Sequence, residues 1–173
     1  VLDFRDKLNA DLQVAIGLET IHPEVLPRLN KQMTTDDFGR AVSFLNQNDI
    51  LSRAFILLRP PFLSEKEGVQ YAKKSMDFAF GCGVECCVVI PTRFGNGALD
   101  FMEKEGCFHE PKINSLEEVL DYGISLRQGR VFADLWDLER FSSCNECFAN
   151  RKQRMDKINL SQRAIPKVKC GCT

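Results

Sequence analysis

The sequence predicts an α/β fold built on parallel strands, and three observations support this prediction. Short, nearly continuous apolar runs alternate along the chain with longer segments that carry apolar residues at helical spacing. Such runs are typical of strands that are buried on both faces and joined by right-handed helical crossovers. The 173 residues are 44% hydrophobic and 27% charged, a composition that allows one core of ordinary size. The strand–helix units fit either part of a (β/α) barrel or an open doubly wound sheet.

The first half of the chain contains two predicted strands. Leu2 to Leu8 has the pattern of a helix end, and Leu12 to Leu18 is a short β-capable run. Thr34 to Asp37 is a helix start, because polar capping residues precede apolar residues at helical spacing. Ile50 to Leu58 is the second strand, and the sequence Arg59-Pro60-Pro61 ends it.

The second half continues the alternation. Ser64 to Glu67 has the capping-box pattern and opens a helix. Glu85 to Ile90 is the third strand, and further helices are expected near Asn96 and from Ser115. Val131 to Leu135 is the fourth strand. The predicted helices between successive strands are therefore long enough for parallel crossovers.

Polar residues lie at or just after the carboxyl end of each predicted strand. They are Glu19 and Thr20, Arg59, Thr92 and Arg93, and Asp134 and Asp137. In parallel α/β folds these ends lie at one edge of the sheet, where ligands bind. Carboxylates accept from hydroxyl or ammonium groups and arginine binds carboxylate or phosphate, so the edge suits a ligand with hydroxyls and a carboxylate. No G-x-G-x-x-G or P-loop motif is present, which disfavours a dinucleotide site of the Rossmann type.

Three segments resemble, in the same order, the second half of the barrel of radical S-adenosylmethionine (radical SAM) enzymes. They are "GLETIHPEVLPRLNKQMTTDDFGRA", "ILSRAFILLRPPFLSEKEG" and "VVIPTRFGNGAL". The resemblance covers roughly residues 12–140. It extends in particular to the radical SAM subunit of archaeosine synthase, which acts on modified tRNA, and to related radical SAM proteins.

This resemblance implies that residues 1–140 are the C-terminal part of a partial radical SAM barrel. It implies that Glu19 contacts the ribose or amino group of S-adenosylmethionine and that Lys31 pairs with its carboxylate. It places three further residues near the cofactor or substrate: Arg59, Thr92 and Arg93. The implied partners are S-adenosylmethionine, the N-terminal part of the same barrel and a tRNA or other RNA substrate.

The cysteine motif of this family is missing from the chain. Radical SAM chemistry requires a [4Fe–4S] cluster held by C-x3-C-x2-C, and this motif does not occur in the sequence. Cys82 and Cys86 have the first spacing, but position 89 is Val and the pair precedes a strand rather than following one. We expect Cys82, Cys86, Cys87 and Cys107 to be small buried apolar residues. The chain alone is therefore expected to be inactive, and the full-length enzyme would supply the cluster ligands.

Four further cysteines lie near the C-terminus in two close pairs, Cys144 with Cys147 and Cys170 with Cys172. Paired spacing of this kind is typical of a tetrahedral zinc site, and an auxiliary iron–sulfur cluster is the alternative. We expect residues 141–173 to form a small basic metal-binding knuckle.

The chain is charged asymmetrically. Residues 151–173 contain seven Lys or Arg and one acid, whereas the whole chain has a net charge of −1. A basic segment can contact an RNA backbone or can be a solvated tail. A second hypothesis is therefore a non-catalytic α/β domain whose zinc knuckle binds RNA or protein. Without a signal peptide or a long apolar run, a cytoplasmic protein with no membrane contact is expected.

Overall fold

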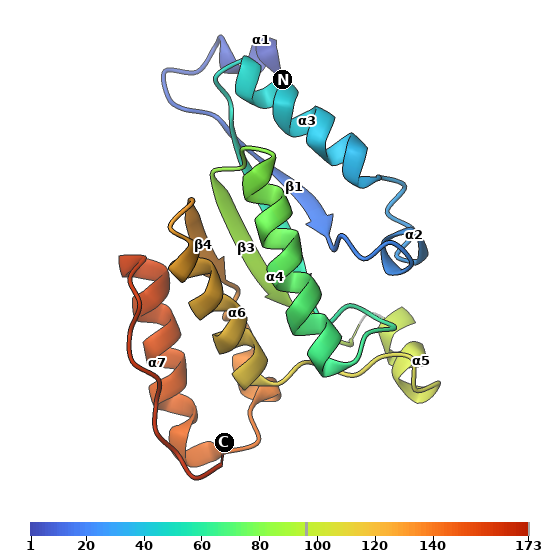
Figure 1. Ribbon diagram of the computed structural model, residues 1–173, viewed down its shortest axis with the longest axis vertical. Coiled ribbons are helices and arrows are strands. Elements are labelled where there is room, and N and C mark those ends of the chain that lie inside the picture. The colour runs from blue at the N-terminus through green and yellow to red at the C-terminus, as the bar shows by residue number, and fades with distance from the viewer. Residues whose placement is uncertain (96, 173) are drawn as a thin grey trace.

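The computed structural model describes residues 1–95 and 97–172, and its centre is a four-stranded sheet (Figure 1). The strands are β1 (Gln13–Glu19), β2 (Leu51–Leu58), β3 (Cys86–Pro91) and β4 (Arg130–Ala133). They pair in parallel and in chain order, β1-β2-β3-β4. This confirms the predicted α/β fold with a parallel sheet. A doubly wound sheet reverses its strand order at a switch point, and these four strands show no such reversal.

The long helices cover one face of this sheet, because each right-handed crossover returns the chain on the same side. Figure 1 shows α4 (Glu65–Gly81) and α6 (Ile113–Leu126) in front of the sheet, with α3 (Thr35–Gln47) near β1 and α7 (Asn145–Ser161) near β4. The short elements are α1 (Leu2–Arg5), α2 (Val25–Arg28), α5 (Ala98–Lys104) and the 3-10 helix η1 (Leu138–Phe141).

A helix begins at each of the two predicted capping motifs, as expected. The Thr34 hydroxyl accepts a hydrogen bond from the Asp37 amide at 3.1 Å, and the Asp37 carboxylate accepts from the Thr34 amide at 2.9 Å. Ser64 and Glu67 form the same reciprocal pair at the start of α4. The hydrogen bonds from Thr34 and Ser64 lower the pKa values of the Asp37 and Glu67 carboxyl groups.

Some element boundaries differ from the expectation. The N-terminal helix was expected from Leu2 to Leu8 but ends at Arg5, and α6 begins at Ile113, before the expected start at Ser115. The helix expected near Asn96 is α5, which begins at Ala98, and Asn96 itself lies outside the described residues.

The segment between the two C-terminal cysteine pairs is not a small knuckle. Most of it lies in the 17-residue helix α7, which packs against β4 and forms ion pairs with Glu117 of α6. Two side-chain amides at the C-terminal end of α7 pair with the outer edge of β4. Asn159 exchanges hydrogen bonds with the Ala133 backbone at 3.0 and 2.9 Å, and Gln162 does the same with Val131 at 2.8 and 3.0 Å. They replace the partners that another strand would supply, so this edge of the sheet is closed.

The two faces of the sheet have different surroundings. On β2, Ala54, Ile56 and Leu58 are fully buried in the core beneath the helices. The alternate residues point to the opposite face because side chains alternate along a strand. There, Phe55 of β2 pairs with Val88 of β3, and both are partly exposed. This second face therefore presents a half-covered apolar surface.

The four cysteines of the first 140 residues have mixed environments. Cys86 and Cys87 are buried as expected, and burial raises the pKa of the Cys86 thiol. Cys82 is only half-buried, and Cys107 is exposed, so the prediction that it is buried was wrong. Cys107 lies in the turn after α5, where no second layer covers it. Within residues 1–95 and 97–172, no helix combines the length and apolar character that crossing a bilayer requires.

Candidate ligand cavity and metal centre

A cavity of about 380 Å³ lies at the carboxyl ends of β1, β2 and β3. It is lined by Glu19, Arg28, Leu29, Asn30, Lys31, Leu57, Pro61, Thr92, Ala98, Leu99 and Met102. The strand ends supply its floor, and the segments that contain α2 and α5 supply its walls. Three of the five residues predicted to contact the cofactor or substrate, Glu19, Lys31 and Thr92, are therefore brought together in one cavity.

Glu19 and Lys31 form an ion pair in this cavity. Lys31 Nζ lies 2.7 Å from Glu19 Oε1, and the side chains are 37% and 17% exposed. Glu19 has a positive φ of 63°, and the register between β1 and β2 shifts between Gly17 and Glu19. A Cβ atom at Gly17 would overlap the Glu19 carboxylate and would lie 2.6 Å from Lys31 Nζ. The irregular end of β1 and the missing side chain at Gly17 thus provide room for the pair.

Thr92 and Arg59 have structural partners. The buried Thr92 hydroxyl donates to the Leu58 carbonyl at 2.9 Å, which ties the end of β3 to the end of β2. The Arg59 guanidinium donates to Glu65 at 2.6 Å and to the Glu110 carbonyl at 2.8 Å. Arg59 therefore lies outside the residues that line the cavity, and it joins the end of β2 to α4 and the loop before α6.

Arg93 is likewise directed away from the cavity. Its guanidinium donates to Asp134 at 2.7 Å and to the Trp136 carbonyl at 2.8 Å. It also lies over the Trp136 ring, 5.1 Å from the ring centroid, and Trp136 is 71% exposed. These contacts connect the end of β3 to the end of β4.

The lining residues Leu57 and Met102 were not singled out from the sequence. Leu57 is the last residue but one of β2, and its position at the predicted strand end, two residues before Arg59, was the available signal. Met102 belongs to α5, whose position over the strand ends depends on the loop that carries it. No local pattern in the sequence fixes that position.

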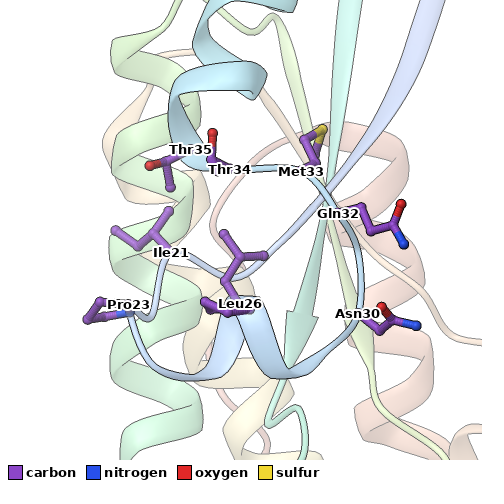
Figure 2. A pocket seen from close by; sticks show the side chains of 9 residues that line it. Ile21, Pro23, Leu26, Asn30, Gln32, Met33, Thr34 and Thr35 are labelled. Atoms are coloured by element: carbon purple, nitrogen blue, oxygen red, sulfur yellow. The ribbon is translucent and has the colours of Figure 1, made fainter.

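A second cavity of about 580 Å³ lies between α2 and the start of α3 (Figure 2). Figure 2 shows Leu26 pointing into the ring formed by segment 21–35, with Asn30 and Gln32 pointing away from it. The residues that line this cavity carry no formal charge. Since Asn30 lines both cavities, the segment that contains α2 separates them. The charged cavity matches the ligand chemistry expected at the strand ends better than this apolar one.

The four C-terminal cysteines form one cluster. Their sulfur atoms all lie within 4.8 Å of one another. The Cys144 and Cys170 sulfurs are 3.8 Å apart, and the Cys147 and Cys172 sulfurs are 3.5 Å apart. The group can therefore hold a metal, as the spacing of the two pairs predicted.

The start of α7 shapes this cluster. Cys144 immediately precedes the helix and Cys147 lies in its first turn. The Cys147 backbone amide, followed by the neighbouring thiols, lowers the pKa of Cys144 to about 7. The thiols of Cys170 and Cys147 raise the pKa of Cys172 to about 12. Thiols bind metals as thiolates, so a bound cation would displace the protons that remain on the cluster.

Two arginines that follow the cysteines are buried. Arg151 and Arg154 are 2% and 4% exposed and form ion pairs with Glu117 on α6 at 2.7 and 3.3 Å. They cannot contact RNA in this arrangement. The sequence pattern did not predict that these arginines are buried and paired, because their acidic partner lies more than thirty residues earlier in the chain.

Comparisons with known proteins gave two relatives, and no protein-family model matches the chain. An uncharacterised protein of Methanocaldococcus jannaschii is 22% identical over 179 residues, which cover 98% of this chain and 49% of that protein. The archaeosine synthase subunit beta of Thermococcus kodakarensis is 40% identical over 65 residues, which cover 37% of this chain and 20% of that protein. The chain therefore spans about half the length of the first relative, and its alignment spans a fifth of the second.

Proposed function

We propose that this chain is the C-terminal part of a radical SAM barrel and contributes part of the site for S-adenosylmethionine and substrate. The observation that carries the proposal is the cavity at the carboxyl ends of three consecutive parallel strands, with Glu19 and Lys31 inside it. The similarity to an archaeosine synthase subunit supports a context of tRNA modification. The chain's span of about half of one relative agrees with a contribution from only part of a larger fold.

The charges in the cavity suit the amino-acid end of S-adenosylmethionine. Lys31 would pair with the ligand carboxylate, and Glu19 would accept from its ammonium group or from a ribose hydroxyl. The two side chains now bind one another at 2.7 Å, so a ligand would exchange one ion pair for two. Leu57 and Met102 would provide apolar contacts for the remainder of the ligand. In the proposed site, Arg59 and Arg93 hold the strand ends in place rather than bind the ligand.

The reductive chemistry of this class requires an iron–sulfur cluster, and the residues of this chain do not fit one at the cavity. C-x3-C-x2-C is absent. Cys82 and Cys86 lie between the end of α4 and the start of β3, which is the opposite edge of the sheet from Glu19. The remaining barrel strands would pair with β1, which among the described strands has a neighbour on one side only, and would cover the face that contains Phe55 and Val88.

The four cysteines would hold a single metal ion, with zinc as the preferred occupant. Zinc–sulfur bonds of about 2.3 Å in a tetrahedron place the sulfurs roughly 3.8 Å apart. The two closest pairs here lie at 3.8 and 3.5 Å. Each thiolate of a [4Fe–4S] cluster binds a different iron and requires a wider arrangement. The spacing therefore favours one ion over the alternative of an auxiliary cluster.

A titration of the isotope-labelled chain with S-adenosylmethionine, followed by NMR, tests the cavity. We expect chemical-shift changes at Glu19, Lys31 and Thr92, and a weaker affinity in both Glu19→Gln and Lys31→Met. Lys73→Met is the matched control, because Lys73 forms a similar ion pair, with Glu118 at 2.6 Å, on the helices outside the cavity. Shift changes elsewhere in the protein, or equal affinity in all four proteins, would refute the assignment.

A second candidate function is an RNA-binding α/β domain without catalytic activity. Its support is the set of exposed basic residues on and after α7: Lys152, Lys157, Arg163, Lys167 and Lys169. They lie between the two cysteine pairs in the sequence, so a bound metal would fix them relative to the cysteines. Binding of tRNA that weakens with salt, together with no response to S-adenosylmethionine, would favour this candidate over the first.

A further inference from the structure

The side chain of Arg151 bridges the cysteine cluster and the acidic face of α6. Its Nε atom donates to the Cys147 sulfur at 3.1 Å, and its Nη2 atom lies 3.9 Å from the Cys172 sulfur. On the other side, its Nη1 atom donates to Glu117 at 2.7 Å and also to Asn114. A single guanidinium therefore contacts two of the four sulfurs and two side chains of α6.

This arrangement is built into the fold. Cys147 and Arg151 are four residues apart on α7, so they lie on the same side of the helix. The Arg151 side chain is 2% exposed and Glu117 is 5% exposed, so both charges are removed from water. Buried charges persist where partners satisfy them, and Arg151 has a partner for each of its three nitrogens.

A divalent ion with four thiolates has a net charge of −2. The nearby Glu117 carboxylate would add to that negative charge, and the Arg151 guanidinium between the sulfurs and Glu117 opposes both. The positive charge of the Arg151 guanidinium lies beside the sulfurs. Its Nε–H group donates a hydrogen bond to the Cys147 sulfur, one of the metal-binding atoms. Hydrogen bonds of this kind orient ligands and alter the electron density on the metal-binding atom.

We infer that Arg151 is the positioning residue of a mononuclear four-thiolate metal centre, donating to the Cys147 thiolate and coupling the metal to α6. The inference rests on the single-ion centre proposed above. It adds that metal binding fixes the C-terminal segment, residues 162–172, against α6 and α7. Arg154 contacts the same segment away from the cysteines: it donates to the Ile165 carbonyl at 2.7 Å and contacts Asp121.

The chain offers a matched control for this inference. Arg154 is as deeply buried as Arg151 and shares Glu117, but none of its hydrogen bonds reaches a sulfur atom. Arg151→Met and Arg154→Met therefore remove the same charge from the same network. Only the first removes the contact to the metal ligands, and Arg151→Lys restores the charge without the forked geometry.

The experiment is titration of the reduced chain with Co²⁺, a spectroscopic substitute for zinc, in competition with a chelator. We expect Arg151→Met to weaken binding by about 10- to 100-fold, Arg151→Lys to lie between it and the wild type, and Arg154→Met to lie within about threefold of the wild type. Removing the N–H bond raises the electron density on sulfur, so the thiolate-to-cobalt charge-transfer band of Arg151→Met should move to lower energy.

The possible outcomes distinguish the proposed role of Arg151 from the proposed metal centre itself. Equal losses in Arg151→Met and Arg154→Met with an unchanged band would show a general structural effect and overturn the inference. An unchanged affinity in Arg151→Met would also overturn it. If the wild-type chain binds no Co²⁺ at the cysteines, the metal centre itself is refuted.

Discussion

Replacing Gly17 by alanine tests the role of the cavity in ligand binding independently of the stability of the fold. The new Cβ atom would overlap the Glu19 carboxylate and lie 2.6 Å from Lys31 Nζ, so both side-chain ends must move away. Both atoms end flexible side chains, and Gly17 is not among the glycines with positive φ. The substitution is therefore expected to break the ion pair without disturbing the strand.

The expected change in stability is small. A partly exposed ion pair contributes about 0 to 1 kcal/mol. Glycine inside a strand is less favourable than alanine by roughly 0.5 to 1 kcal/mol, which offsets that loss. We expect the free energy of unfolding to change by less than about 1 kcal/mol, which corresponds to a shift in Tm of no more than about 2–4 °C.

Thermal unfolding followed by circular dichroism measures the stability, and the NMR titration measures binding of S-adenosylmethionine. Gly17→Ala should retain the fold and lose the ligand response. Gly39→Ala is the control, since a Cβ there meets only the Cys82 sulfur at 3.9 Å and neither residue lines the cavity. Normal binding by Gly17→Ala would refute the role of the Glu19–Lys31 pair, and a loss of several kcal/mol would refute the steric reasoning.

Three further predictions concern the fold. Gly123→Ala should destabilise the protein by about 1–3 kcal/mol in urea unfolding, because its Cβ would lie 2.7 Å from Val131 Cγ1; an unchanged midpoint would contradict this packing. Asn159→Ala leaves the Ala133 amide and carbonyl without their partner and should cost about 1–3 kcal/mol, with faster hydrogen exchange at Ala133 as the local readout. Ser64→Ala should cost about 1 kcal/mol at neutral pH through loss of the helix cap. Since Ser64 lowers the pKa of Glu67, this contribution is present above the ordinary carboxyl pKa and should diminish as the pH falls through the folded-state pKa; a pH-independent difference would contradict the reciprocal capping box.

The sequence was informative where local chemistry decides the structure. The four apolar runs became parallel strands, and the capping residues at Thr34 and Ser64 start α3 and α4. The helix α7 was missed because its buried face includes Arg151 and Arg154, which look solvent-exposed in a pattern of polar and apolar residues. Their burial depends on Glu117, a partner that local periodicity does not reveal.

The same limit applies to the cavity. Glu19 and Lys31 were predicted together, and the structure pairs them. Arg59 and Arg93 were assigned to the same edge of the sheet, and they do lie at its strand ends. Glu65 and Asp134 bind their guanidinium groups, so neither arginine lines the cavity. Strand-end position fixes which edge a residue reaches, and partners from other elements decide where its side chain points.

The single metal ion at the four cysteines is the central claim of this account, because it joins the C-terminal segment to the sheet through α7. Elemental analysis of chain purified without oxygen, combined with a sulfide assay, tests it most directly. We expect one zinc ion per chain, no acid-labile sulfide, and loss of the metal in Cys144→Ser. Iron and sulfide in comparable amounts would contradict a mononuclear centre and establish a cluster, and reduced protein without any metal would refute the site.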